Sequence, residues 1–225
     1  MNSAAIQPAN TAKAPSLFAL GLFASALLVG CANPVNTKTA EKYWNAGYAA
    51  QQAGNWSDAQ MYYSRSILNA EMGSADRRTM AVLWYEYGRA SGVVCDWEEA
   101  QNGLGKAHYY DRLSEGPVHM SSYEMGRMFT VREMYPEAER YFAQAFEEFE
   151  QANSDTRDPI GYAVFLDEYV RALQHNGQAG KANEYTARAR KIREAFPEGE
   201  SHTDLTPYGT HCKDDAGEAP MAESK

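Results

Sequence analysis

A pattern of small and bulky residues recurs four times along the chain, and it constrains the fold more than any other feature. In three copies a glycine is followed twelve positions later by an alanine, as Gly88 is by Ala100. In the fourth copy Val170 replaces the glycine, with Ala182 at the same distance. Equivalent positions lie 41, 38 and 44 residues apart (47 to 88, 88 to 126 and 126 to 170). Small residues let two helices approach closely and bulky residues fill the resulting grooves, so the pattern predicts stacked helix pairs.

Each copy, taken in full, resembles a tetratricopeptide (TPR) repeat. The first carries a large residue, a small pair, and then an alanine with an aromatic residue four positions on: Tyr43, Ala46, Gly47, Ala59 and Tyr63. The four copies span residues 40–73, 81–114, 119–152 and 160–196. The last diverges most, because Val170 and Thr186 stand where the template has a small and an aromatic residue. The resemblance implies an all-α, right-handed solenoid of about four helix-turn-helix repeats.

The composition agrees with an all-α class and argues against one kind of partner. Aromatic residues are abundant, with 15 Tyr, 8 Phe and 4 Trp, while runs of β-branched residues are scarce. This balance favours helices that pack through aromatic side chains. Lys and Arg number 21 against 30 Asp and Glu, which gives a formal net charge of −9. Binding of nucleic acid requires basic side chains that neutralise phosphates, so we expect no nucleic-acid partner.

An apolar run over residues 17–29 ends in Leu28-Val29-Gly30-Cys31. The run has the length of the hydrophobic region of a signal peptide. The tetrapeptide resembles the lipobox of bacterial lipoproteins, in which the Cys thiol is diacylated, the preceding peptide bond is cut and the new amino group is acylated. The resemblance implies a signal peptide over residues 1–30 and a lipid anchor at Cys31. An uncleaved or cytoplasmic helix is the alternative, because Lys13 is the one basic residue ahead of the run.

The residue after the lipobox cysteine is Ala32, and not the Asp that typically keeps a lipoprotein at the inner membrane. For a Gram-negative host the resemblance therefore implies an outer-membrane lipoprotein that faces the periplasm. Residues 31–39 lack helical periodicity, and we expect a lipidated tether there. Residues 197–225 are polar with scattered Pro and Gly, which predicts a disordered tail.

The TPR resemblance implies a concave face lined by positions 2, 5, 9 and 12 of each repeat. Arginine occupies position 9 in three successive repeats, and a glutamate precedes each arginine by three residues. The expected groove residues are Trp44, Tyr48, Tyr85, Arg89, Tyr123, Arg127 and Arg171. Two interpretations stay open: the arginines hold a carboxylate or an acidic extended segment, or they pair with Glu86, Glu124 and Glu168 and only set the stacking of the repeats.

Two cysteines remain besides Cys31. Cys95 falls in the predicted turn between the helices of the second repeat, and Cys212 falls in the tail. In an oxidising compartment they can form a disulfide that pins the tail across the solenoid, or both can stay free. The sequence carries no nucleophile elbow, phosphate-binding loop or zinc-protease motif. We therefore expect no catalytic residues, no metal, no cofactor and no enzymatic activity.

These features together predict a membrane-anchored periplasmic scaffold that binds a protein partner in envelope assembly or secretion. Its architecture is similar to that of secretin pilotins or cell-wall synthase regulators. An alternative is binding of cell-wall peptide or glycan fragments, in which Trp44, Tyr85 and Tyr123 stack on sugars and Arg89 or Arg127 holds a carboxylate. A self-assembling structural protein is a third reading.

Overall fold

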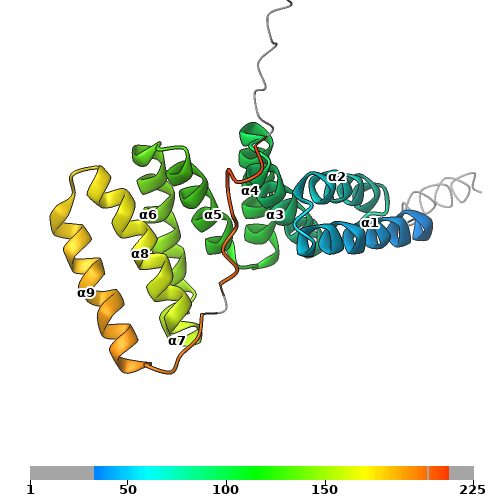
Figure 1. Cartoon of the computed structure of the whole chain (residues 1–225). Coiled ribbons are helices and arrows are strands. Elements are labelled where there is room, and N and C mark those ends of the chain that lie inside the picture. Colours follow the sequence, from blue (N-terminus) through cyan, green and yellow to red (C-terminus); the bar gives the residue numbers. More distant parts are fainter. Residues whose placement is uncertain (1–32, 202, 213–225) are drawn as a thin grey trace, which may run out of the picture. The chain divides into compact units, whose positions relative to one another are not determined.

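The computed structural model describes residues 33–201 and 203–212. Cys31 and the predicted signal peptide over residues 1–30 lie outside the described residues, as do residues 213–225. The described part is all-α, and Figure 1 labels its helices. They are α1 (Pro34–Gln52), α2 (Trp56–Met72), α3 (Arg77–Val93), α4 (Trp97–Ser114), α5 (Val118–Val131), α6 (Tyr135–Gln151), α7 (Ser154–Arg157), α8 (Pro159–His175) and α9 (Ala179–Ala195).

The long helices pack as pairs of sequence neighbours, α1 with α2, α3 with α4, α5 with α6 and α8 with α9. Each pair packs in turn on the next pair along the chain, through α2 with α3, α4 with α5 and α6 with α8 (Figure 1). The single turn α7 falls in the loop between the third and fourth pairs. The predicted all-α class and pairwise packing are confirmed. Within the described residues, no helix combines the length and apolar character needed to cross a membrane.

A three-residue turn of one geometry closes every pair. Its middle residue has a positive φ in all four turns: 76° at Gly54, 65° at Cys95, 57° at Glu133 and 73° at Gly177. Glycine adopts this left-handed conformation without steric cost, whereas Cys95 and Glu133 adopt it at some cost. The shared turn explains why the helix pairs are alike despite their different sequences.

The small residues of the repeat pattern lie where two helices touch. A Cβ atom added to Gly88 would lie 2.7 Å from the backbone nitrogen of Leu104, and one added to Gly126 would lie 2.7 Å from the ring of Phe142. Ala100 and Ala138, twelve positions on, are fully buried. The helices of a pair therefore approach at distances that exclude a side chain, as the pattern predicts.

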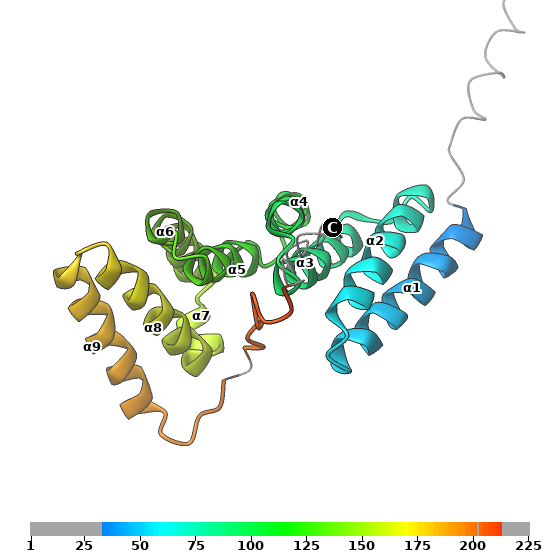
Figure 2. The same cartoon turned by 45° about the horizontal axis from the view of Figure 1, so that its top comes forward.

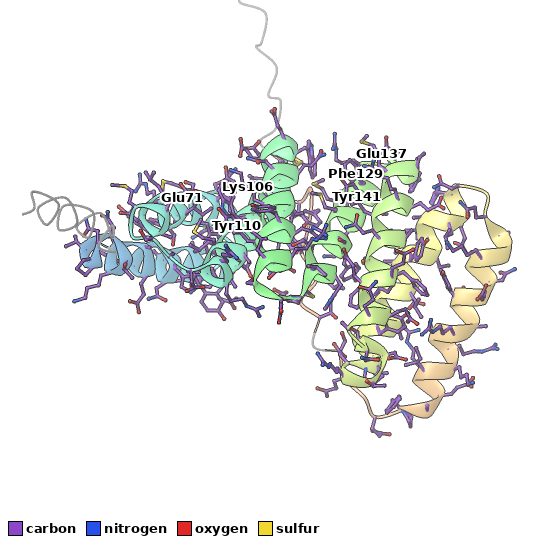
Figure 3. The ribbon with its side chains drawn as sticks, turned by 180° about the vertical axis from the view of Figure 1, so that it is seen from behind. Glu71, Lys106, Tyr110, Phe129, Glu137 and Tyr141 are labelled. Carbon is purple, nitrogen blue, oxygen red and sulfur yellow. A yellow bond between two sulfur atoms is a disulfide. The ribbon has the colours of Figure 1, made fainter. Side chains whose placement is uncertain are left out.

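Aromatic side chains fill the core of the third and fourth pairs. Tyr123 packs edge-to-face on Phe165, with ring centroids 5.5 Å apart, and Phe149 lies 4.5 Å from the same ring. Figure 3 shows Phe129 of α5 and Tyr141 of α6 side by side, where their rings stack 5.4 Å apart. Aromatic packing of this kind contributes stability beyond the area it buries.

Two predicted boundaries on the N-terminal side were wrong. The tether expected over residues 31–39 gives way to helix at Pro34, because the Asn33 side chain accepts a hydrogen bond from the backbone nitrogen of Val35 and proline suits a first helical position. The second repeat begins at Arg77 and not at residue 81, because Asp76 caps α3 by accepting from the backbone nitrogen of Thr79 at 2.9 Å.

The disordered tail predicted over residues 197–225 was wrong for residues 203–212. These residues, which we call the strap, cross α5 and α3 (Figures 1 and 2, orange-red); residues 203–207 are extended and residues 208–211 form a turn. Thr206 is 2% exposed and Tyr208 is 5% exposed. The ring of Tyr208 rests on Gly92, where an added Cβ atom would lie 2.5 Å from it. The buried Thr206 and Tyr208 side chains thus help to order a segment whose composition is that of a loop.

Candidate functional site

The strap contacts the face formed by α3 and α5, and Arg89 of α3 is its principal contact. The Arg89 Nε atom donates to Thr206 Oγ1 at 2.6 Å and Nη2 donates to Asp204 Oδ2 at 2.7 Å. Its Nη1 atom donates to Glu86 on the same helix at 3.1 Å. The guanidinium is 5% exposed, whereas Asp204 stays largely exposed at the edge of the groove. Arg89 therefore holds an acidic extended segment with one side of its fork and its own helix with the other.

The carboxylates around Arg89 determine its charge state. Burial alone would lower the pKa of this guanidinium, but the carboxylates of Glu86 and Glu124 raise it above its ordinary value. Burial also raises the pKa of Glu86, and the charge of Arg89 opposes that rise. The site is thus a partly desolvated cation that keeps its charge because acidic groups surround it.

Arg127 of α5 joins three parts of the chain. Its Nη1 atom lies 3.2 Å from Glu124 one turn earlier, its Nε atom lies 2.9 Å from Glu168 of α8, and its Nη2 atom donates to the Thr206 carbonyl oxygen at 3.1 Å. Its guanidinium carbon lies 5.7 Å from the centre of the Tyr208 ring, a cation–π contact. Arg127 therefore fixes adjacent repeats and the strap at the same time.

Arg89 and Arg127 make contacts of both kinds that the two interpretations of the arginine ladder expect, and binding of a ligand from another molecule stays a prediction. Each pairs with the glutamate three residues before it, as a stacking device requires, and each also binds an extended segment, which here belongs to the same chain. Arg171, the third arginine, lies on α8 with its side chain exposed. It borders a small pocket of about 130 Å³ together with Glu168 and Thr130.

A disulfide fixes the far end of the strap. Cys95, in the turn between α3 and α4, is bonded to Cys212, which lies 117 positions later in the sequence, with the two Cα atoms 4.9 Å apart. Beside it, at the last turn of α3, the backbone nitrogens of Gly209 and His211 donate to the carbonyl oxygens of Gly92 and Val93. The last turn of α3 therefore receives the strap through covalent and backbone bonds as well as side chains.

The groove remains open between α1 and α3, where α2 forms the floor. A pocket of about 410 Å³ lies there. Val82, which is 40% exposed, and Trp44 stand at its walls, with the charged side chains of Glu41 and Arg78 beside them. The remaining lining residues are small or apolar: Thr37, Ala40, Ser66, Ala70, Ala75, Thr79 and Leu83. An apolar concave surface with a few polar groups is typical of binding pockets.

Comparison with known proteins gives the fold but no sequence family. No protein-family model matches the chain, and no curated protein matches its sequence. Among solved structures, BtubC (BKLC) from P. vanneervenii superposes with a TM-score of 0.65 at 13% identity, covering 74% of this chain and 67% of that chain. MamA gives a TM-score of 0.58 at 14% identity, covering 73% and 84%.

A third structure carries the repeat by name. The kinesin light chain from Podosopora anserina, described as having nearly identical TPR-like repeats, gives a TM-score of 0.57 at 17% identity and covers 71% of this chain and 77% of that chain. The chain has a TPR-like repeat fold. Identities this low carry the fold alone, so the site of this TPR-like protein is argued from its own residues.

The residues predicted for the TPR-like groove lie in different parts of the structure. Arg89 and Arg127 meet the strap, while Trp44 lines the open pocket and Tyr48 is 52% exposed one turn further along α1. Tyr123 is 1% exposed and packs among the aromatic rings of the core, and it borders a separate pocket of about 310 Å³ together with Met120 and Thr203.

Tyr85 is half-buried beside Arg89, whose guanidinium carbon lies 5.5 Å from the centre of its ring. Stacking of Tyr85 and Tyr123 on a sugar, as the cell-wall alternative requires, therefore does not fit this geometry.

Sequence reasoning placed Val82, at position 2 of the second repeat, on the concave face and left open that a disulfide pins the tail. It missed Arg78, Thr79 and Leu83 and the path of the strap. Arg78, Thr79, Val82 and Leu83 recur at spacings of three and four, which places them on one face of α3. That spacing was the available signal for the pocket wall. For the strap the available signal was Asp204, Thr206 and Tyr208, an alternation that suits an extended segment with one face inward.

Proposed function

We propose that this protein is a lipid-anchored adaptor without catalytic activity, and that it binds a segment of a protein partner in the open pocket between α1 and α3. The observation that carries the proposal is the pocket itself, an unfilled apolar surface on the concave face of a TPR-like array. Repeat arrays of this kind use that face for binding. The strap contacts the neighbouring part of the face, over α3 and α5, and leaves this pocket accessible to a partner.

The chemistry of the pocket indicates what the partner segment must carry. Its apolar walls fit bulky apolar side chains, and burial of such side chains supplies the affinity. Glu41 on one side and Arg78 on the other offer opposite charges to the flanking residues of the segment. An amphipathic protein segment with one or two large apolar residues meets both requirements.

Anchoring through Cys31 supports the same proposal. The lipobox ends at Cys31, and two residues separate it from the first residue of α1. Several acyl chains give stable membrane attachment where one chain would be marginal. A tethered adaptor has a raised effective concentration toward partners at the same membrane, which suits a role in envelope assembly or secretion.

Site-specific photo-crosslinking in intact cells tests the proposal. A crosslinking residue at position 82 of the full-length lipoprotein should attach one envelope protein, while the same residue at Leu68, which is 57% exposed on α2 outside the pocket, should not. Val82→Asp should weaken binding of the identified partner by about tenfold or more, whereas Leu68→Asp should leave it unchanged. Cys31→Ser should move the protein out of the membrane fraction.

Three results would count against the proposal. Equal adducts from positions 82 and 68 would show that the pocket does not select a partner. Absence of adducts at position 82 would show that no protein partner binds in the pocket. Membrane fractionation of the Cys31→Ser variant identical to that of the unaltered protein would remove the anchor.

A further inference from the structure

The strap is bound in the way that a peptide ligand is bound in a groove. One carboxylate, that of Asp204, pairs with Arg89 at the edge. The hydroxyl and carbonyl oxygens of Thr206 accept from Arg89 and Arg127 in the centre. The Tyr208 ring packs on Gly92, and two backbone amides continue onto the end of α3. Side-chain contacts over residues 204–208 are thus followed by backbone contacts over residues 209–211, a combination that peptide recognition also uses.

The surface beneath the strap differs from one that needs a permanent cover. Beneath Asp204 and Thr206 it consists of the ion pairs of Arg89 with Glu86 and of Arg127 with Glu124, whereas the Tyr208 ring belongs to the hydrophobic core cluster. Charged groups become solvated when a cover leaves, whereas an apolar surface loses its burial free energy. The part of the strap that lies over the two arginines can therefore leave at less cost than it could leave a hydrophobic surface, and the Tyr208 ring is its apolar anchor.

The segment that precedes the strap, residues 196–201, also allows the strap to be released. Residues 196–201, which lead from α9 to the strap, are all exposed. Within the strap, Thr206 and Tyr208 are the buried polar and aromatic contacts, while Asp204 and Leu205 remain exposed. The strap is thus attached to the fold by few contacts, by an exposed linker and by the Cys95–Cys212 disulfide.

We infer that Arg89, Arg127 and Gly92 form a second peptide-binding site whose resident ligand is the strap. When the strap is released, the site binds a segment of another protein. That segment carries an acidic residue, a threonine, a tyrosine and a glycine in the same spacing as Asp204, Thr206, Tyr208 and Gly209 of the strap. The glycine is required because Gly209 has a φ of 72°. The inference rests on the proposed function only in assigning the concave face to protein segments, since it concerns a different site.

The Cys95–Cys212 disulfide, which we call the latch, holds the strap in this site. Cys212 is exposed, so a thiolate of a dithiol oxidoreductase can attack its Sγ atom, and Cys95 then leaves as a thiolate and takes up a proton. The second thiol of the oxidoreductase resolves the mixed disulfide. The dithiol supplies both electrons and becomes a disulfide, and the protein gains two thiols. With the latch closed, the strap is held at high effective concentration and outcompetes other segments.

Fluorescence anisotropy with a labelled peptide of residues 203–211 tests the inference on the full chain in detergent. The oxidised protein should bind the peptide weakly. The variant Asp204→Ala with Tyr208→Ala and Cys212→Ser, whose strap is disarmed, should bind it at least about tenfold more tightly. Peptides of scrambled order, or with asparagine in place of the aspartate, should lose that gain. Two results would overturn the inference: a folded disarmed variant that does not bind the native peptide, or one that binds the native and scrambled peptides equally.

A second measurement tests the inference even if the disarmed variant does not fold. The unaltered protein treated with dithiothreitol keeps all its side chains and loses only the latch, so it should bind the peptide more tightly than the oxidised protein does. Unchanged binding after reduction would overturn the inference. Neither measurement touches the α1–α3 pocket, so partner crosslinking at position 82 can succeed or fail independently.

Discussion

Arg89 and Arg127 occupy the same position in successive repeats, and their surroundings explain why an acidic protein buries them. Each has a glutamate three residues earlier on its own helix, so the fork is partly neutralised before any other group approaches. The remaining donors of Arg89 face the strap, whereas those of Arg127 divide between Glu168 of the next repeat and the strap. The Glu-x-x-Arg spacing is visible in the sequence, but the second partner of each arginine is not.

Arg127→Met tests this arrangement at the residue scale. The substitution keeps much of the side-chain volume but leaves Glu124, which is 1% exposed, without its cation. Removal of one partner from a buried pair is strongly destabilising, and we expect a loss of about 2 to 4 kcal/mol in the free energy of unfolding. Arg171→Met, at the equivalent but exposed position, should change it by less than about 0.5 kcal/mol. Urea unfolding of both variants provides the measurement, and equal effects would contradict the assigned roles.

At the scale of the helix pair, the sequence predicts most of the structure, because the pattern Gly88 with Ala100 records a contact between two helices. It does not predict where helices begin, since those points depend on the caps Asn33 and Asp76, whose side chains are also common in loops. It offers a pinned tail as one alternative but does not predict the path of the strap, because the alternation of Asp204, Thr206 and Tyr208 is too short to distinguish from a polar loop. Contacts that recur in every repeat can therefore be predicted from this sequence, whereas a contact made by one side chain outside the repeats cannot.

A pair of glycine substitutions tests the close approach of helices. Gly88→Ala places a methyl group 2.7 Å from the Leu104 backbone nitrogen, so α3 and α4 must separate, at a cost of about 1 to 3 kcal/mol. Gly180→Ala, in α9 with no atom within 4 Å of the added carbon, should instead stabilise the protein by up to about 1 kcal/mol. Thermal and urea unfolding monitored by circular dichroism would reveal opposite signs. A neutral Gly88→Ala would contradict the packing.

At the scale of the whole described unit, the strap changes how a repeat array behaves. In a simple array each repeat contacts only its neighbours, so stability propagates from pair to pair. Here the chain that follows α9 returns to α3 and is bonded there through Cys95 and Cys212, which are 117 residues apart. The second helix pair is thereby linked directly to the end of the fourth. The strap covers part of the concave face and leaves the pocket between α1 and α3 open.

Amide hydrogen exchange of the oxidised and reduced protein tests most directly whether the strap is a ligand held by a latch on an independently stable array. The amides of Gly209 and His211, which donate to Gly92 and Val93, should be protected in the oxidised protein. Reduction should speed their exchange by about tenfold or more, while the core amides of α3 and α5 keep their protection. Unprotected strap amides in the oxidised protein, or loss of protection in α3 and α5 together with the strap, would contradict the account.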